Sequence, residues 1–111
     1  MQPPKPGTGP TKKTRRAVPE EAVRRAVLAY LKSCAPAVCF CSVPGGIFKR
    51  GAPDLLLCVR GRFVALELKR PGGELTELQA ESLRMIRAAG GIAEVVHSAD
   101  EARALIEPHL T

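Results

Sequence analysis

Two carboxylates and a lysine are the residues of this chain whose types and spacing best suit chemistry. Asp54 directly precedes the apolar run 55–59, and Glu67 and Lys69 lie at the end of a second run, 62–69. Two carboxylates that face each other repel unless a cation lies between them, and Mg²⁺ prefers carboxylate oxygens. A lysine beside such a cation can orient or deprotonate a water, or stabilise charge on a phosphate. The three residues therefore indicate a metal-dependent nuclease.

The residues between the two runs decide whether these side chains meet. Arg60-Gly61 is typical of a two-residue hairpin turn, which would pair Val59 with Arg62. Counting back from that pair places Asp54 opposite Glu67, and directly opposite residues of an antiparallel pair lie on one face. The sequence therefore predicts an antiparallel hairpin that brings the two carboxylates together.

The flanking segments predict the elements that position this hairpin. Apolar residues recur at helical spacing before it, and a capping-box pattern, Thr76-x-x-Gln79, opens a helix after it. The resulting order, α-β-β-β-α-β-α, predicts an α/β domain with a mixed β-sheet flanked by helices. The expected segments are a helix over 19–33, strands over 37–43, 54–59 and 62–69, a helix from 76 to about 89, a strand over 92–96 and a helix from 98 to about 107.

The composition is that of one globular domain. The chain has 111 residues, 45% of them hydrophobic and 25% charged, enough for a modest core. No apolar stretch approaches the roughly 18 residues that span a membrane. The N-terminus lacks the apolar segment of a secretory signal. We therefore expect residues 19–111 to form one domain, with no membrane partner and a cytoplasmic location.

The net charge of +6 lies mostly in residues 1–18, which contain five of the 17 lysines and arginines and no acidic residue. This segment also holds four prolines and no periodic apolar pattern, so we expect a disordered tail. It is either a DNA-binding arm or a solubilising leader. The loop before Asp54 likewise either meets phosphates or forms a solvated tip. The DNA-binding candidates are Lys12, Lys13, Arg15 and Arg16 in the tail, and Lys49 and Arg50 in the loop.

The four cysteines, Cys34, Cys39, Cys41 and Cys58, include no Cys-x-x-Cys pair. A zinc site is therefore not expected. Cys39 and Cys41 alternate along one predicted strand, and Cys58 lies within another. We expect reduced, buried thiols that act as small apolar side chains.

Several of these residues together resemble the VRR-NUC family of the PD-(D/E)XK nuclease superfamily. The motifs are Gly51-Ala52-Pro53-Asp54-Leu55, Glu67-Leu68-Lys69, Gly72-Gly73, Gln79, Gly90-Gly91 and Ser98. The resemblance covers roughly residues 19–107. It implies a restriction-endonuclease-like core and a Mg²⁺ or Mn²⁺ ion held by Asp54, Glu67 and the carbonyl of Leu68.

The resemblance also implies further site residues. An acidic residue of the first helix joins the cluster in this family, and Glu20, with Glu21 as the alternative, is expected to bind the metal directly or through water. Gln79 matches a family glutamine, yet it is also the expected capping partner of Thr76, and both roles stay open. The family often has glutamine where this chain has Arg24.

The function implied is that of a DNA endonuclease, in which Lys69 orients water or stabilises the transition state. Small viral and bacterial members of the family act on branched DNA, such as four-way junctions, as homodimers, and the same is expected here, in a bacterial or phage-infected cell. One alternative is a non-catalytic DNA-binding module, although such a module has no need of opposed carboxylates. Another is a nickase or a restriction-like nuclease.

Overall fold

The helices and strands occur in the predicted order in the computed structural model, which describes residues 18–45 and 50–111. A short 3₁₀ helix follows the last α-helix. The predicted fold class, α/β with a mixed sheet, is confirmed. The elements are α2 (Glu20–Ser33), β1 (Val38–Ser42), β2 (Leu55–Val59), β3 (Arg62–Leu68), α3 (Glu77–Ala88), β4 (Ile92–Val96), α4 (Ala99–Ile106) and η3 (Glu107–His109).

The hairpin of β2 and β3 forms with the predicted register. The two strands are antiparallel, and Val59 pairs with Arg62. Arg60 and Gly61 both have positive φ angles, 46° and 90°, which is the backbone that a type I′ hairpin turn requires. This turn sets the alignment of the whole hairpin, including its open end at Asp54.

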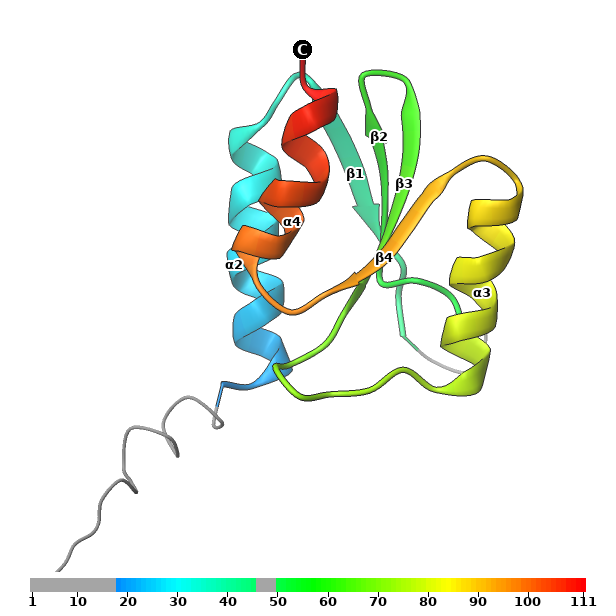
Figure 1. Cartoon of the computed structure of the whole chain (residues 1–111). Coiled ribbons are helices and arrows are strands. Elements are labelled where there is room, and N and C mark those ends of the chain that lie inside the picture. The colour runs from blue at the N-terminus through cyan, green and yellow to red at the C-terminus, as the bar shows by residue number, and fades with distance from the viewer. Residues whose placement is uncertain (1–17, 46–49) are drawn as a thin grey trace, which may run out of the picture.

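The sheet has the strand order β1-β2-β3-β4, and only its last pair, β3 and β4, is parallel. The connection between the parallel strands passes through α3, which covers one face of the sheet, while α2 and α4 cover the other (Figure 1). β3 is therefore central in the fold, paired on both sides and packed on both faces.

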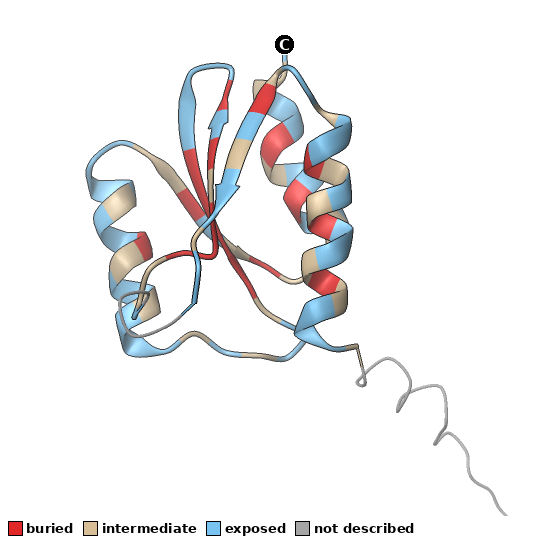
Figure 2. Cartoon of the chain, turned by 180° about the vertical axis from the view of Figure 1, so that it is seen from behind, coloured by how far each residue is buried: buried red, intermediate tan, exposed pale blue. Residues whose placement is uncertain are grey.

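Most of the core lies between the sheet and the pair α2 and α4. α2 buries Val23, Val27 and Leu31, which recur every four residues and so form one stripe. Each such side chain contributes about 1.5–3 kcal/mol by its removal from water. A smaller cluster under α3 holds Leu83 with Ala65 and Ala93. Buried residues run along the central strands in Figure 2.

The loop before Asp54 packs closely on α3. Gly51 has a φ of 77°, and a Cβ atom there would lie 3.0 Å from the Cβ atom of Leu78. A side chain at this position would be strained and would push the loop away from the helix. The glycine therefore keeps the start of β2 near the first turn of α3, where Gln79 lies.

The prediction of buried cysteines was wrong. Cys39, Cys41 and Cys58 are exposed and Cys34 is half-buried, and all four are free thiols. The three strand cysteines lie on the sheet face away from α2 and α4, at positions that α3 does not reach. Alternation along a strand identifies two faces, but it does not say which part of each face a helix covers.

No helix in the described part of the chain is long and apolar enough to cross a membrane. The predicted disordered tail falls almost wholly on residues outside those the structure describes, as do the tail cations and Lys49. Val18 is the first described residue, and it packs against the main core.

Candidate active site

Asp54 is a buried carboxylate fixed from both sides. One of its oxygens, Oδ2, accepts a hydrogen bond from the backbone N–H of Leu68 at 2.8 Å. Its backbone carbonyl accepts one from the N–H of Val43 at 2.9 Å. The side chain therefore reaches across the open end of the hairpin to β3, as the register predicts.

Glu67 is the second buried carboxylate, and only 2% of its surface is exposed. Its Oε2 accepts a hydrogen bond from Nε2 of Gln79 at 3.0 Å. The ammonium nitrogen of Lys69 lies 4.0 Å from the same oxygen. Within residues 18–45 and 50–111, Asp54 and Glu67 are the only buried polar or charged residues. Burying two acidic groups opposes folding unless charge and hydrogen bonds compensate, and Leu68 and Gln79 donate such hydrogen bonds here while Lys69 supplies a positive charge.

The sequence left open whether Gln79 caps α3 or contacts the carboxylates, and in the structure its side chain does both. Its Oε1 accepts the backbone N–H of Thr76 at 2.9 Å, and its own backbone N–H donates to Oγ1 of Thr76 at 3.2 Å, which completes the capping box. The amide nitrogen is thereby left to donate to Glu67. The helix cap and the contact with the carboxylate are therefore one arrangement, in which the cap orients the amide.

The carbonyl of Leu68 is directed to the side of the strand on which Asp54 lies. Successive residues of a strand direct their backbone groups to opposite sides. The N–H of Lys69 donates to the carbonyl of Val96 in β4 at 3.1 Å, whereas the N–H of Leu68 donates to Asp54. The carbonyl of Leu68 shares the side of its own N–H, so it lies on the same side of β3 as the carboxylate of Asp54, in the residue that follows Glu67.

These donors fit a hard divalent cation. All three are oxygens, the set that Mg²⁺ and Mn²⁺ accept, and both ions keep several water ligands. In the described ranges 18–45 and 50–111, no three His, Cys, Asp or Glu side chains gather as a metal site. Glu20 and Glu21 lie in the exposed first turn of α2 and are not gathered with the buried pair.

Arg24 is a residue of this site that the sequence did not identify as functional. Its Nη2 lies 3.5 Å from Oδ1 of Asp54, and its side chain is 27% exposed. The contact joins residues thirty positions apart. The only indication in the sequence that Arg24 lies near the site was its position on α2, beside the buried Val23 and four residues after Glu20.

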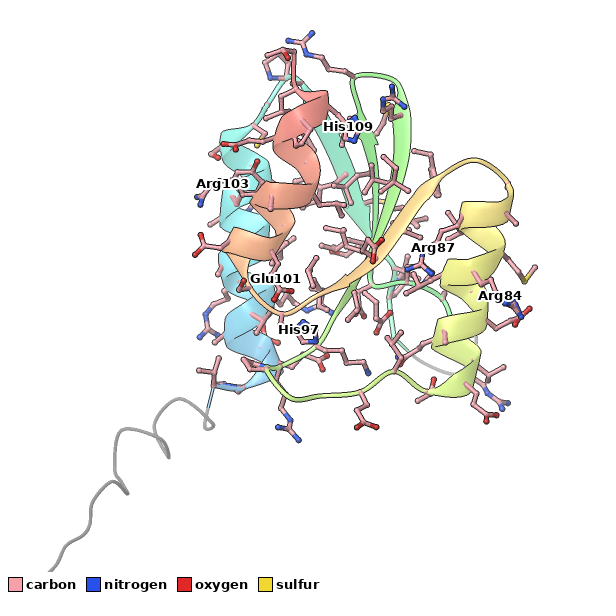
Figure 3. All side chains as sticks on the ribbon, viewed as in Figure 1. Arg84, Arg87, His97, Glu101, Arg103 and His109 are labelled. Carbon is pink, nitrogen blue, oxygen red and sulfur yellow. The ribbon has the colours of Figure 1, made fainter. Side chains whose placement is uncertain are left out.

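Other residues near the strand ends have structural partners. His97 donates its backbone N–H to Oε1 of Glu101 at 2.8 Å, and its Nδ1 lies 3.0 Å from the same oxygen. Figure 3 shows the two side chains together where β4 meets α4. The backbone hydrogen bond from His97 lowers the pKa of Glu101. Arg50 is exposed in the loop before Asp54.

A comparison with known families identifies the family of the chain. The family model described as the VRR-NUC domain matches residues 15–100. That range contains Asp54, Glu67, Lys69 and Gln79, together with Arg24. No curated protein and no solved structure matches the chain significantly.

Proposed function

Since the chain belongs to the VRR-NUC family of nucleases, we propose that it is a metal-dependent DNA endonuclease with Asp54, Glu67 and Lys69 at its active site. The observation that carries the proposal is the opposed pair of buried carboxylates at the open end of the hairpin. A protein that only binds DNA gains nothing from two acidic groups held together out of water.

Asp54, Glu67 and the carbonyl of Leu68 would hold Mg²⁺ or Mn²⁺. When bound, such an ion polarises the phosphodiester and lowers the pKa of a bound water. The hydrogen bond from Leu68 holds the carboxylate of Asp54 in one orientation, and Gln79 does the same for Glu67. Both carboxylates are thus positioned before a ligand arrives, which reduces the reorganisation that catalysis requires.

Lys69 supplies a positive charge beside Glu67. Its ammonium nitrogen is 4.0 Å from Oε2 of that residue, and its side chain is 15% exposed. Such a charge can orient the attacking water or stabilise the negative charge that develops on the phosphate. Products with 5′-phosphates are expected from the family resemblance.

Glu20 is the helix carboxylate that we assign to the site in preference to Glu21. It lies four residues before Arg24 and seven before the buried Val27, so these three residues share one side of α2. Because Arg24 reaches Asp54, that side faces the open end of the hairpin. Glu20 would act through a water molecule.

The substrate that we propose is branched DNA, including four-way junctions, cut by a homodimer. Two symmetric copies would allow one small domain to cut two strands. Arg50, Lys49 and the tail cations Lys12, Lys13, Arg15 and Arg16 would contact phosphates, which contribute affinity without sequence specificity.

The direct test is a cleavage assay on linear, flap and four-way DNA of matched length, with Mg²⁺, with Mn²⁺ and with a chelator. We expect cleavage with either ion, greatest on branched DNA, and none with chelator. Size-exclusion chromatography with light scattering on the same sample would test the dimer. Absence of cleavage on every substrate, or cleavage unaffected by chelator, would overturn the proposed function.

A further inference from the structure

We propose that Arg24 alternates between two partners: the carboxylate of Asp54 in the metal-free protein, and a phosphate of the DNA once the cation is bound. This inference deepens the proposed nuclease function and depends on it. It assigns a positioning role to Arg24.

The two oxygens of Asp54 have different contacts. Oδ2 accepts the N–H of Leu68 at 2.8 Å, a well-formed hydrogen bond from a rigid strand. Arg24 approaches the other oxygen, Oδ1, at the longer distance of 3.5 Å and from a side chain that is 27% exposed. The backbone contact fixes the carboxylate, whereas the guanidinium contact is weak and can be exchanged.

A cation that uses Oδ1 must compete with Arg24. A guanidinium does not lose its proton in proteins, so it cannot become neutral when a divalent ion arrives. The ion and the guanidinium repel each other over the short distance between them. Arg24 is therefore displaced from Asp54 when the ion binds.

The displaced side chain has an obvious new partner. Guanidinium groups bind phosphate oxygens with two parallel hydrogen bonds. Arg24 is on the side of α2 that faces the open end of the hairpin, where a phosphate must lie to be cut. Glutamine in its place would neither oppose the cation nor attract the phosphate by charge.

The test measures metal and DNA binding separately, in Arg24→Gln and in a matched control, Arg25→Gln. Arg25 is exposed on the same turn of α2, so the control removes an equal charge. Mn²⁺ binding is measured by calorimetry without DNA. DNA binding is measured by fluorescence anisotropy with Ca²⁺ as a non-cleaving ion over a range of salt concentrations.

We expect Arg24→Gln to bind Mn²⁺ about threefold to fivefold more tightly than wild type, the size of a partly exposed ion pair. With Ca²⁺ present, its DNA affinity should fall and its salt slope should decrease by about one. Arg25→Gln should alter metal binding by much less. Arg24→Lys keeps the charge but not the paired hydrogen bonds, so it should bind Mn²⁺ like wild type and DNA more weakly.

Equal Mn²⁺ affinity in Arg24→Gln and wild type would overturn the inference, as would equal effects of the two glutamine variants. Tighter Mn²⁺ binding with unchanged DNA binding would also overturn it, because the second partner would be absent. Failure of the proposed function is a distinct outcome: wild-type protein would then neither bind Mn²⁺ nor cut DNA.

A separate observation concerns the exposed thiols. Cys39 of β1 pairs directly with Cys58 of β2, and both are exposed. Arg60 donates its N–H to the carbonyl of Ala37, so the alternate pair Cys39 and Cys58 is also a hydrogen-bonded pair, with Cα atoms about 5.5 Å apart. This spacing is within the range of about 4.4–6.8 Å usual for a disulfide. We infer that these two thiols form an intramolecular disulfide when a small disulfide oxidant, such as oxidised glutathione, is present.

Oxidised glutathione is the only co-reactant that this thiol–disulfide exchange needs. The thiolate of one cysteine attacks the oxidant and releases one glutathione thiol, and a mixed disulfide forms on the protein. The thiolate of the partner cysteine then attacks the protein sulfur of that mixed disulfide and releases the second glutathione. The protein loses two electrons and two protons, which reduce the oxidant to two thiols. The disulfide would close a covalent loop of residues 39–58, which contains Asp54.

Oxidation by oxidised glutathione, followed by intact mass and non-reducing peptide mapping, tests this inference. Wild type and the control Cys34→Ser should each yield a linked pair of peptides containing Cys39 and Cys58, with two hydrogens lost from that pair. Cys58→Ser should stop at a glutathione adduct on Cys39. A linkage through Cys41 instead, or a stable glutathione adduct on Cys39 or Cys58 of wild type, would overturn it.

Discussion

The two ends of the β2–β3 hairpin differ sharply in what they bury. Near the turn, the strands bury Leu57, Val59 and Val64 against the helices. At the open end, the same two strands bury Asp54 and Glu67. One register aligns both ends, so the turn that pairs Val59 with Arg62 also places Asp54 and Glu67 at opposing positions just beyond the pair Leu55 and Leu66. Apolar packing at one end therefore aligns carboxylates at the other end that need hydrogen bonds and positive charge to be buried.

The largest expected effect is on chemistry at the open end. Asp54→Asn removes a negative charge that the proposed cation needs, and it preserves an oxygen to accept the N–H of Leu68. Cleavage should fall by about 10³-fold or more, with the fold intact by circular dichroism. Asp100→Asn, at an exposed position in α4, is the matched control. If Asp54→Asn cuts DNA as fast as wild type, the proposed site is wrong.

Near the turn, the expected effect is on stability. Leu57→Ala removes a buried side chain from the main core and should lower the free energy of unfolding by about 2–5 kcal/mol. Urea denaturation measures this change. The cleavage rate per folded molecule should be unaltered. A loss of cleavage beyond the unfolded fraction would show that the two ends are not separable.

Gln79 both caps α3 and donates a hydrogen bond to Glu67, and two variants can separate these contacts. Gln79→Ala and Thr76→Ala both break the capping box and should each destabilise α3 by about 1 kcal/mol. Only Gln79→Ala also removes the hydrogen bond to Glu67, so it alone should slow cleavage, by about tenfold. Equal cleavage rates in the two variants would show that Gln79 acts only as a cap.

The smallest effect expected is from the tail. Deleting residues 1–16 removes five cations but retains Val18, which packs on the core. DNA binding should weaken at low salt, and the salt slope should fall by about 0.9 for each phosphate that the tail would otherwise neutralise. Cleavage at saturating DNA should persist. An unchanged slope would show that the folded domain binds phosphates on its own.

The sequence was most informative where a few neighbouring residues decide the structure. Arg60-Gly61 predicted the turn and, through it, the register that opposes Asp54 and Glu67. Thr76 and Gln79 predicted the start of α3 for the same reason, because a capping box is a local interaction.

Local sequence patterns do not predict contacts between elements that are distant in the sequence. Arg24 meets Asp54 only because α2 packs against the sheet with Arg24 near the open end of the hairpin, and helical periodicity does not specify that position. The second contact of Gln79 depends on where α3 lies relative to β3. The exposure of Cys39 and Cys58 depends on how far α3 extends over its face of the sheet.

The central claim, that Asp54 and Glu67 form a cation site, is tested most directly by thermal unfolding of the metal-free protein at increasing Mn²⁺ concentration. A ligand that binds only the folded state raises the melting temperature. We predict that Mn²⁺ raises the melting temperature of wild type and leaves those of Asp54→Asn and Glu67→Gln nearly unchanged. An equal rise in all three proteins, or no rise in wild type, would contradict the claim.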